Sequence, residues 1–123
     1  MTTKEIAEQL VAFCRQGKFE TAQKDLYATD AISIEPYATP TFARETKGLN
    51  ALIEKAQAFT AMIEQVHSIS VSDPLVADNS FACAMQLDVT LKGHGRMKMD
   101  ELCIYEVKDG KIISEQFTSR FQV

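Results

Sequence analysis

The stretch that decides the fold is residues 96–121, RMKMDELCIYEVKDGKIISEQFTSRF. Apolar and polar side chains alternate along most of it, which is typical of β-strands that bury one face. Asp109-Gly110 interrupts the alternation, and this dipeptide is a strong signal for a tight hairpin turn. We therefore predict two antiparallel strands, over residues 96–107 and 111–121.

Two further strands are expected before this hairpin, because the alternation extends back to residue 66. Residues 66–72 and 80–92 fit the strand pattern, and the segment after Pro74, up to Ala77, could extend the first of them. Turn residues separate the strands: Asp73-Pro74, Asp78-Asn79 and Gly93-His94-Gly95. The four strands are expected to follow one another as an antiparallel meander.

Three helices are predicted upstream of the meander. Thr2-Thr3-Lys4-Glu5 is a capping-box pattern that begins the first helix, and Gly17 ends it. The second runs from near Phe19 to Asp30, and the third follows Gly48 with an apolar stripe of helical spacing. A short strand at 31–35 and a long loop at 36–47 lie between the last two helices.

These elements predict one α+β domain over residues 1–123, in which three helices cover one face of a curved antiparallel sheet. The 123-residue chain carries 13 Lys+Arg against 17 Asp+Glu, a net charge of −4, with no basic cluster that would bind nucleic acid. It has no apolar run long enough for a membrane span, and its N-terminus lacks the apolar region of a signal peptide. We expect a cytoplasmic protein.

Three ionisable residues interrupt the odd-numbered, apolar face of the predicted sheet: His67, Glu101 and Glu115. A carboxylate among apolar side chains must find a cation or hydrogen bonds, or its pKa rises. One interpretation is structural: each Glu reaches water at a strand end or pairs with Arg44 or Arg96. The other is a shared pocket for general acid–base chemistry, in which a carboxyl pKa near that of histidine is required.

Other side chains on the same face are candidates for contact with a ligand. Tyr105 has a hydroxyl that could donate a hydrogen bond, although core packing is the commoner role for such a residue. The remaining candidates are Cys103, Met85, Leu87 and Phe117. No metal site or cofactor is expected, since the two histidines and three cysteines do not have metal-ligand spacing.

Two stretches resemble a known family: residues 27–36, YATDAISIEP, with Gly48 after them, and residues 104–112, IYEVKDGKI. They resemble the nuclear transport factor 2-like superfamily, and within it the SnoaL-like polyketide cyclases and ketosteroid isomerases. The resemblance implies a cystatin-like cone and places Glu35 at the position of the isomerases' general base. The isomerases' oxyanion donors are not matched, because Leu10 and Val11 stand near one of those positions and Cys103 at the other.

Two functions follow from these observations. In the first, the protein is a cofactor-free isomerase- or cyclase-type enzyme for a small apolar carbonyl compound, with Glu35 as base, Glu101, Glu115 or Tyr105 as donor, and His67 as second proton carrier. In the second, it is a non-catalytic ligand-binding or dimeric scaffold domain. In both, a homodimer is expected through the outer, even-numbered sheet face: Ala82, Ala84, Leu102, Ile104 and Ile112.

Overall fold

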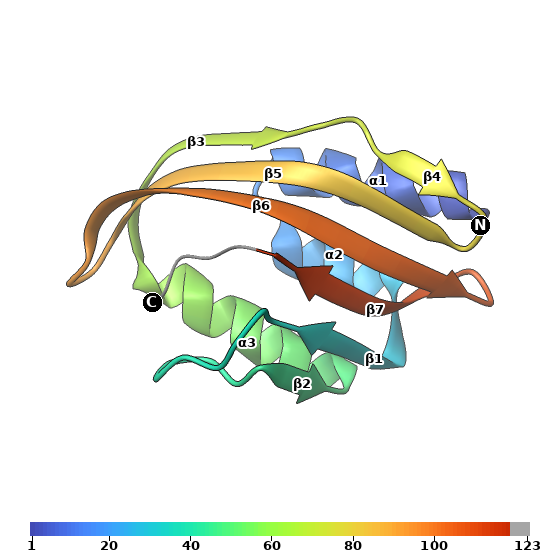
Figure 1. Ribbon diagram of the computed structural model, residues 1–123, viewed down its shortest axis with the longest axis horizontal. Coiled ribbons are helices and arrows are strands. Elements are labelled where there is room, and N and C mark those ends of the chain that lie inside the picture. The colour runs from blue at the N-terminus through green and yellow to red at the C-terminus, as the bar shows by residue number, and fades with distance from the viewer. Residues whose placement is uncertain (119–123) are drawn as a thin grey trace.

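The computed structural model describes residues 1–118 and consists there of three helices and seven strands (Figure 1). The helices are α1 (Thr3–Arg15), α2 (Phe19–Leu26) and α3 (Leu49–Met62). The strands are β1 (Tyr27–Ile34), β2 (Glu45–Lys47), β3 (Ile63–Val71), β4 (Leu75–Ala77), β5 (Ser80–Leu91), β6 (Gly95–Lys108) and β7 (Lys111–Phe117). Residues 119–121 of the predicted last strand lie outside the described part.

The helices begin where the sequence predicts, and the second one ends early. Thr2 and Glu5 form the expected capping box, in which each side chain accepts a hydrogen bond from the other residue's backbone N–H. The second helix was predicted to reach Asp30, but it ends at Leu26 and β1 begins at Tyr27. Aromatic and β-branched residues from Tyr27 to Ile34 favour a strand, and pairing with β7 stabilises that conformation.

The sheet is mixed, so the prediction of a purely antiparallel sheet is wrong. Its strand order is β2-β1-β7-β6-β5-β3, with β4 paired to β5. The meander β3-β5-β6-β7 is antiparallel as predicted, but β1 pairs with β7 in parallel. Hairpin signals in a sequence reveal only strand pairs that are close along the chain. More than 70 residues separate β1 from β7, so their pairing was not predicted.

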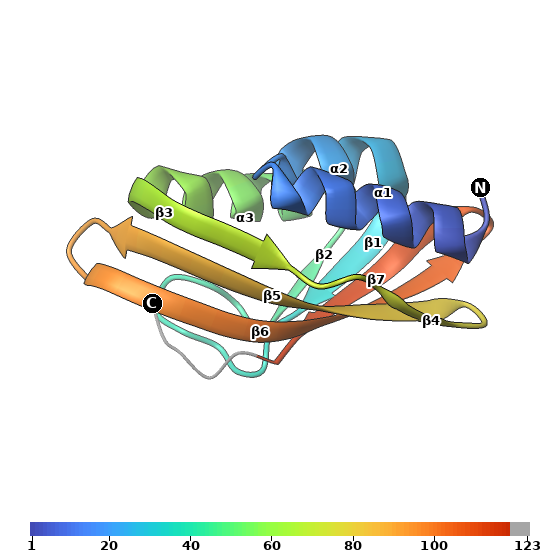
Figure 2. The same cartoon turned by 90° about the horizontal axis from the view of Figure 1, so that it is seen from above.

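All three helices lie on one side of the curved sheet, which leaves the other side uncovered (Figure 2). The cross-strand pairs Met85↔Glu101 and Leu87↔Met99 follow the predicted parity, and the apolar side chains of the odd-numbered face are buried against the helices. The α+β cone predicted from the sequence is therefore confirmed. Among residues 1–118, no helix is long and apolar enough to cross a membrane.

β-Bulges in β7 and in β3 shift the predicted parity by one residue. In β7, Val107 pairs with Ile112 and Glu106 with Ser114, so Ile113 is the extra residue. Ile112 is 0% exposed and belongs to the core, which corrects its predicted place on the outer face. In β3 the register shifts twice, first between the pairs Ile63↔Leu91 and Gln65↔Thr90 and then at His67, between the pairs Val66↔Val89 and Ser68↔Asp88.

The other four residues expected on the outer face remain there. Leu102 is 44% exposed, Ala84 is exposed, and Ala82 and Ile104 are half-buried. The homodimer through this face stays a prediction.

The connection between β1 and α3 depends on Gly48. This residue has φ +91° and ψ 141°, a conformation that is essentially restricted to glycine, and its N–H donates to the carbonyl oxygen of Ala31 at 2.8 Å. Gly48 thereby fixes the start of α3 against β1. It sets the direction in which the helix passes over the sheet.

Gly48→Ala should lower the free energy of unfolding by about 1–3 kcal/mol, because a Cβ makes this backbone conformation unfavourable. Space is not the cause, since an added Cβ would meet no atom within 4 Å. Urea unfolding followed by circular dichroism measures the change. Asn50→Ala, an exposed change in the first turn of the same helix, is the control and should stay within about 0.5 kcal/mol of the wild type. Equal stabilities of the two variants would contradict the role of Gly48.

Candidate functional site

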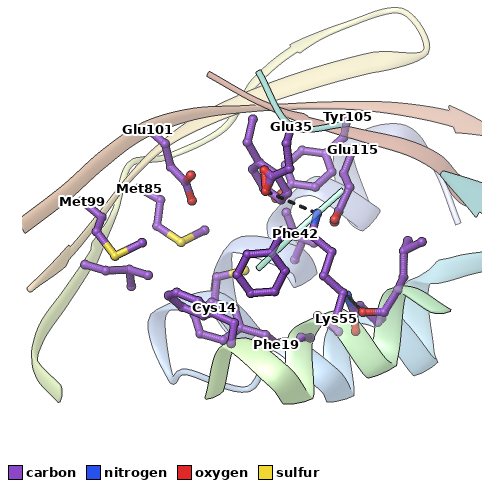
Figure 3. A pocket seen from close by; sticks show the side chains of 18 of the residues that line it. Cys14, Phe19, Glu35, Phe42, Lys55, Met85, Met99, Glu101, Tyr105 and Glu115 are labelled. Carbon is purple, nitrogen blue, oxygen red and sulfur yellow. Dashed lines mark hydrogen bonds and ion pairs between the residues drawn. The ribbon is translucent and has the colours of Figure 1, made fainter. Parts of the chain in front are cut away.

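A cavity of about 180 Å³ lies between the helices and the sheet (Figure 3). Its walls come from all three helices, from β1, β5, β6 and β7, and from the loop that follows β1. Most of the lining is apolar or aromatic, including Phe19, Phe42, Phe59, Met85, Leu87, Met99 and Phe117. A small number of polar side chains in such a wall is the usual arrangement of a small-molecule site.

Three of the four predicted catalytic residues line this cavity: Glu35, Glu101 and Glu115. Glu35 directly follows β1, and its N–H donates to the carbonyl oxygen of Arg44 at 2.7 Å. Glu101 projects from β6 and Glu115 from β7. The carboxyl groups of these three residues, distant in sequence, therefore share one space (Figure 3).

The cation that faces these acids is Lys55 of α3. Its Nζ lies 3.3 Å from Oε1 of Glu35 and 5.5 Å from the centre of the Phe117 ring. The Lys55 and Glu35 side chains are only 15% and 23% exposed, so this ion pair is shielded from solvent. Neither Arg44 nor Arg96, the partners predicted for the acids, pairs with them through its side chain in the described part of the chain. Arg96 binds both carboxylate oxygens of Asp88 at 3.0 and 2.9 Å, and Arg44 contacts Glu35 through its backbone.

Lys55 was missed by the sequence analysis, although a signal for it exists. It lies three residues after Leu52 and four before Phe59, which places its side chain in the apolar stripe of the helix. A lysine within such a stripe has either a long reach to solvent or a buried acid as partner. Here the partner is Glu35.

Glu115 is buried and accepts hydrogen bonds at both carboxyl oxygens. The hydroxyl of Tyr27 donates to Oε1, and the hydroxyl of Ser33 donates to Oε2 at 2.6 Å. Lys55 in turn donates to the Ser33 oxygen at 2.9 Å, so a continuous chain of hydrogen bonds runs from Lys55 to Glu115. Burial raises the pKa of Glu115, and the two donated hydrogen bonds oppose that rise. Glu115 is therefore the acceptor at the end of this chain of hydrogen bonds.

Glu101 differs from the other two acids because its carboxyl group has no partner in the described part of the chain. Within residues 1–118 it makes no hydrogen bond and no ion pair, although it lines the cavity. Burial raises its pKa to about 7, and the negative charges of Glu35 and Glu115 add to the effect, while Lys55 opposes it. Close to neutral pH, Glu101 can therefore both donate and accept a proton.

Four of the five residues predicted to contact a ligand line the cavity, and one does not. Tyr105, Met85, Leu87 and Phe117 line the cavity. The Tyr105 ring stacks on Phe81, and within the described residues its hydroxyl makes no hydrogen bond. Cys103 is fully buried beside the sheet partner Cys83 and is not part of the lining.

His67 is not brought to the cavity. Its Nε2 lies 2.8 Å from the hydroxyl oxygen of Thr90, and its charge acts on Asp88; both partners are even-numbered residues of β5. The bulge in β3 explains this, since the extra residue turns the ring to the outer side of the sheet. Within the described chain, no group of three or more His, Cys, Asp or Glu side chains could hold a metal ion.

Glu101→Gln should stabilise the protein at alkaline pH. In the folded state the pKa of Glu101 is about 7, against an ordinary value of 4.5, so folding favours the protonated form. Stability is therefore lost as pH rises from about 4.5 to 7, and the full cost is present above pH 7. At about 1.4 kcal/mol per pKa unit, the variant should gain up to about 3 kcal/mol at pH 8 and little at pH 4.

Urea unfolding of the wild type and of Glu101→Gln at pH 4 and pH 8 measures this difference. Glu106→Gln, an exposed change on the same strand, is the matched control and should leave the pH dependence as it is. A stability gain for Glu101→Gln that is the same at both pH values would show that ionisation of Glu101 is not its cause.

Comparison with known proteins agrees with this fold. The model of the family described as SnoaL-like domain matches residues 1–119. One similar solved structure is that of a Mesorhizobium loti protein described as a proposed SnoaL-like polyketide cyclase. It is 36% identical, with a TM-score of 0.88 over 96% of this chain and 99% of that one.

Two more distant structures share the fold alone. A Xanthomonas campestris protein of unknown function with a cystatin-like fold is 18% identical, with a TM-score of 0.82 over 99% of this chain and 93% of that one. A Catenulispora acidiphila protein with a ketosteroid isomerase-like fold, in complex with trimethylamine, is 17% identical, with a TM-score of 0.72 over 99% of this chain and 88% of that one. No curated protein matches. With the family matched over nearly its whole length, the chain belongs to the SnoaL-like domain family.

Proposed function

We propose that this protein is a cofactor-free acid–base catalyst that moves a proton on a small, largely apolar carbonyl compound. The observation that carries the proposal is the carboxyl group of Glu101, which has no partner among residues 1–118 and lies in an apolar cavity that also holds the Glu35–Lys55 ion pair. Two carboxyl groups in one site therefore have different environments. Such a pair commonly divides the roles of acid and base.

Glu35 is the base in this proposal. Nζ of Lys55 lies 3.3 Å from its carboxylate, and the Glu35 side chain lines the cavity. Glu35 removes a proton from the carbon next to the substrate carbonyl. The electron pair of that C–H bond forms a carbon–carbon double bond, and the carbonyl π electrons move to oxygen.

Glu101 is the acid that meets this developing negative charge. When protonated, it donates its proton to the carbonyl oxygen, so that a neutral enol forms and Glu101 becomes a carboxylate. Where the substrate has a carbon–carbon double bond next to the deprotonated carbon, the enol is a conjugated dienol. Transfer of the proton from Glu35 to the far carbon of that dienol and return of the enol proton to Glu101 then complete an isomerisation, whereas return to the same carbon gives exchange alone. Tyr105 offers a second donor from the same wall, whereas both oxygens of Glu115 are already occupied by Tyr27 and Ser33.

Exchange of α-protons into a simple ketone tests this chemistry without knowledge of the natural substrate. Cyclohexanone in D₂O, followed by NMR, should incorporate deuterium faster in the presence of the wild type. Glu35→Gln should reduce the rate by at least about 100-fold and Glu101→Gln by about 10- to 100-fold. Glu106→Gln, which changes an exposed carboxylate of β6, is the control and should keep the wild-type rate.

The pH dependence adds a second readout. A reaction that requires protonated Glu101 should slow as pH rises through about 7, and Glu101→Gln should lose that inflection. Wild-type exchange at the rate of buffer alone, or full activity of both Gln variants, would contradict the catalytic proposal. Saturable ketone binding under those circumstances would instead favour the non-catalytic ligand-binding function.

A further inference from the structure

The volume of the cavity limits the size of the ligand, which membership of the family alone does not. Its volume of about 180 Å³ lies below the 300–1,000 Å³ that is usual for drug-sized ligands. An engineered apolar cavity of about 150 Å³ in another protein takes up benzene, which is one six-membered ring. The space here therefore suits one ring with a short substituent.

One aromatic side chain is placed so as to set this limit. Phe42 lines the cavity together with the three acids and with Cys14 and Phe19, and in the view of Figure 3 its ring is seen between these two groups. Phe42 comes from the loop between β1 and β2, whereas the other phenylalanines of the lining belong to helices or to β7. Its ring, like that of Tyr37, is therefore part of the wall that this loop adds to the helices and the sheet.

The loop holds Phe42 in place through a compact turn. The N–H of Thr39 donates to the carbonyl oxygen of Phe42 at 2.8 Å, and the N–H of Phe42 donates to the hydroxyl oxygen of Thr39 at 2.9 Å. The N–H of Thr41 also donates to that hydroxyl oxygen, at 3.2 Å. These contacts are local, so truncation of the Phe42 ring leaves the helices and the sheet intact.

The charges of the cavity wall restrict the ligand further. Three carboxyl groups, those of Glu35, Glu101 and Glu115, face the single ammonium group that the described lining contributes, Lys55. Lys55 is already bound to Glu35 and Ser33, so little positive charge remains for an anion. A neutral ligand fits this balance best.

We propose that Phe42 is the size-determining residue of the cavity and that the ligand is a neutral carbonyl compound with a single ring. The carbonyl group in this inference rests on the proposed function, whereas the size limit rests on the volume and on Phe42. A tetracyclic steroid or a fused-ring polyketide would require the Phe42 ring to leave the cavity. Phe42 therefore selects the substrate by exclusion.

Two ketones that differ only in ring number test this proposal: acetophenone and 2-acetylnaphthalene. Their dissociation constants, measured by calorimetry, should favour acetophenone by at least about tenfold in the wild type, because the second ring has no space. Phe42→Ala should bind 2-acetylnaphthalene at least about tenfold more tightly than the wild type does. Phe42→Leu should lie between the two.

Phe13→Ala is the matched control, since Phe13 packs against the core but does not line the cavity. It should keep the wild-type preference. Benzoate, an anion with the same ring as acetophenone, should bind at least about tenfold more weakly than acetophenone at pH 8. Equal binding of both ketones by the wild type, no binding of either, an unchanged preference in Phe42→Ala, or tighter binding of benzoate would each overturn the proposal.

The dissociation constants separate this inference from the proposed function. Glu101→Gln should keep the size preference while it loses proton exchange. Size selection without exchange in the wild type would therefore refute the catalytic function alone. Exchange without size selection would refute the role of Phe42 alone.

Discussion

The buried carboxylate of Glu115 is the constraint on which the rest of the site depends. A carboxylate removed from water is costly unless hydrogen bonds or a cation compensate, and here Tyr27, Ser33 and, through Ser33, Lys55 do so. These residues belong to β1, β7 and α3, so one electrostatic requirement fixes how the helix and the two parallel strands meet. Lys55, once held there, also determines where Glu35 lies.

The asymmetry between Glu35 and Glu101 follows from that arrangement. Lys55 binds Glu35 on one side of the cavity, so Glu35 is paired, whereas Glu101 has no partner within residues 1–118. Burial and the charges of the other acids then raise the pKa of Glu101. The resemblance left the isomerases' oxyanion donors unmatched in this chain. Glu101 nevertheless supplies an acidic group to the cavity from a different position.

Alternation and turn residues are local signals, and they were sufficient for most of the fold and for placing Glu101 and Glu115 on the inner face of the sheet. The position of Glu35 was expected from the resemblance to the family, and whether the acids share a pocket was left open. The sequence did not reveal the positions at which one extra residue reverses the alternation of inward and outward side chains along a strand. A bulge turns His67 to the outer side and another brings Ile112 into the core, and no residue type in these segments announces an extra position. The parallel pairing of β1 with β7 and the contact of Lys55 with Glu35 arise from tertiary structure, so period and propensity do not reveal them.

The bulge at Ile113 has a consequence for how this protein can change over evolution. Before it, β7 presents Ile112 to the core together with Val107; after it, the strand presents Glu115 and Phe117 to the cavity. The two halves are out of phase, so selection for packing near the hairpin does not dictate which residues reach the ligand. One strand thus contains a half that packs in the core and a half that lines the cavity. A change at Phe117 would alter the surroundings of the ligand while Ile112 and Glu115 keep their places in the core and in the hydrogen-bond network.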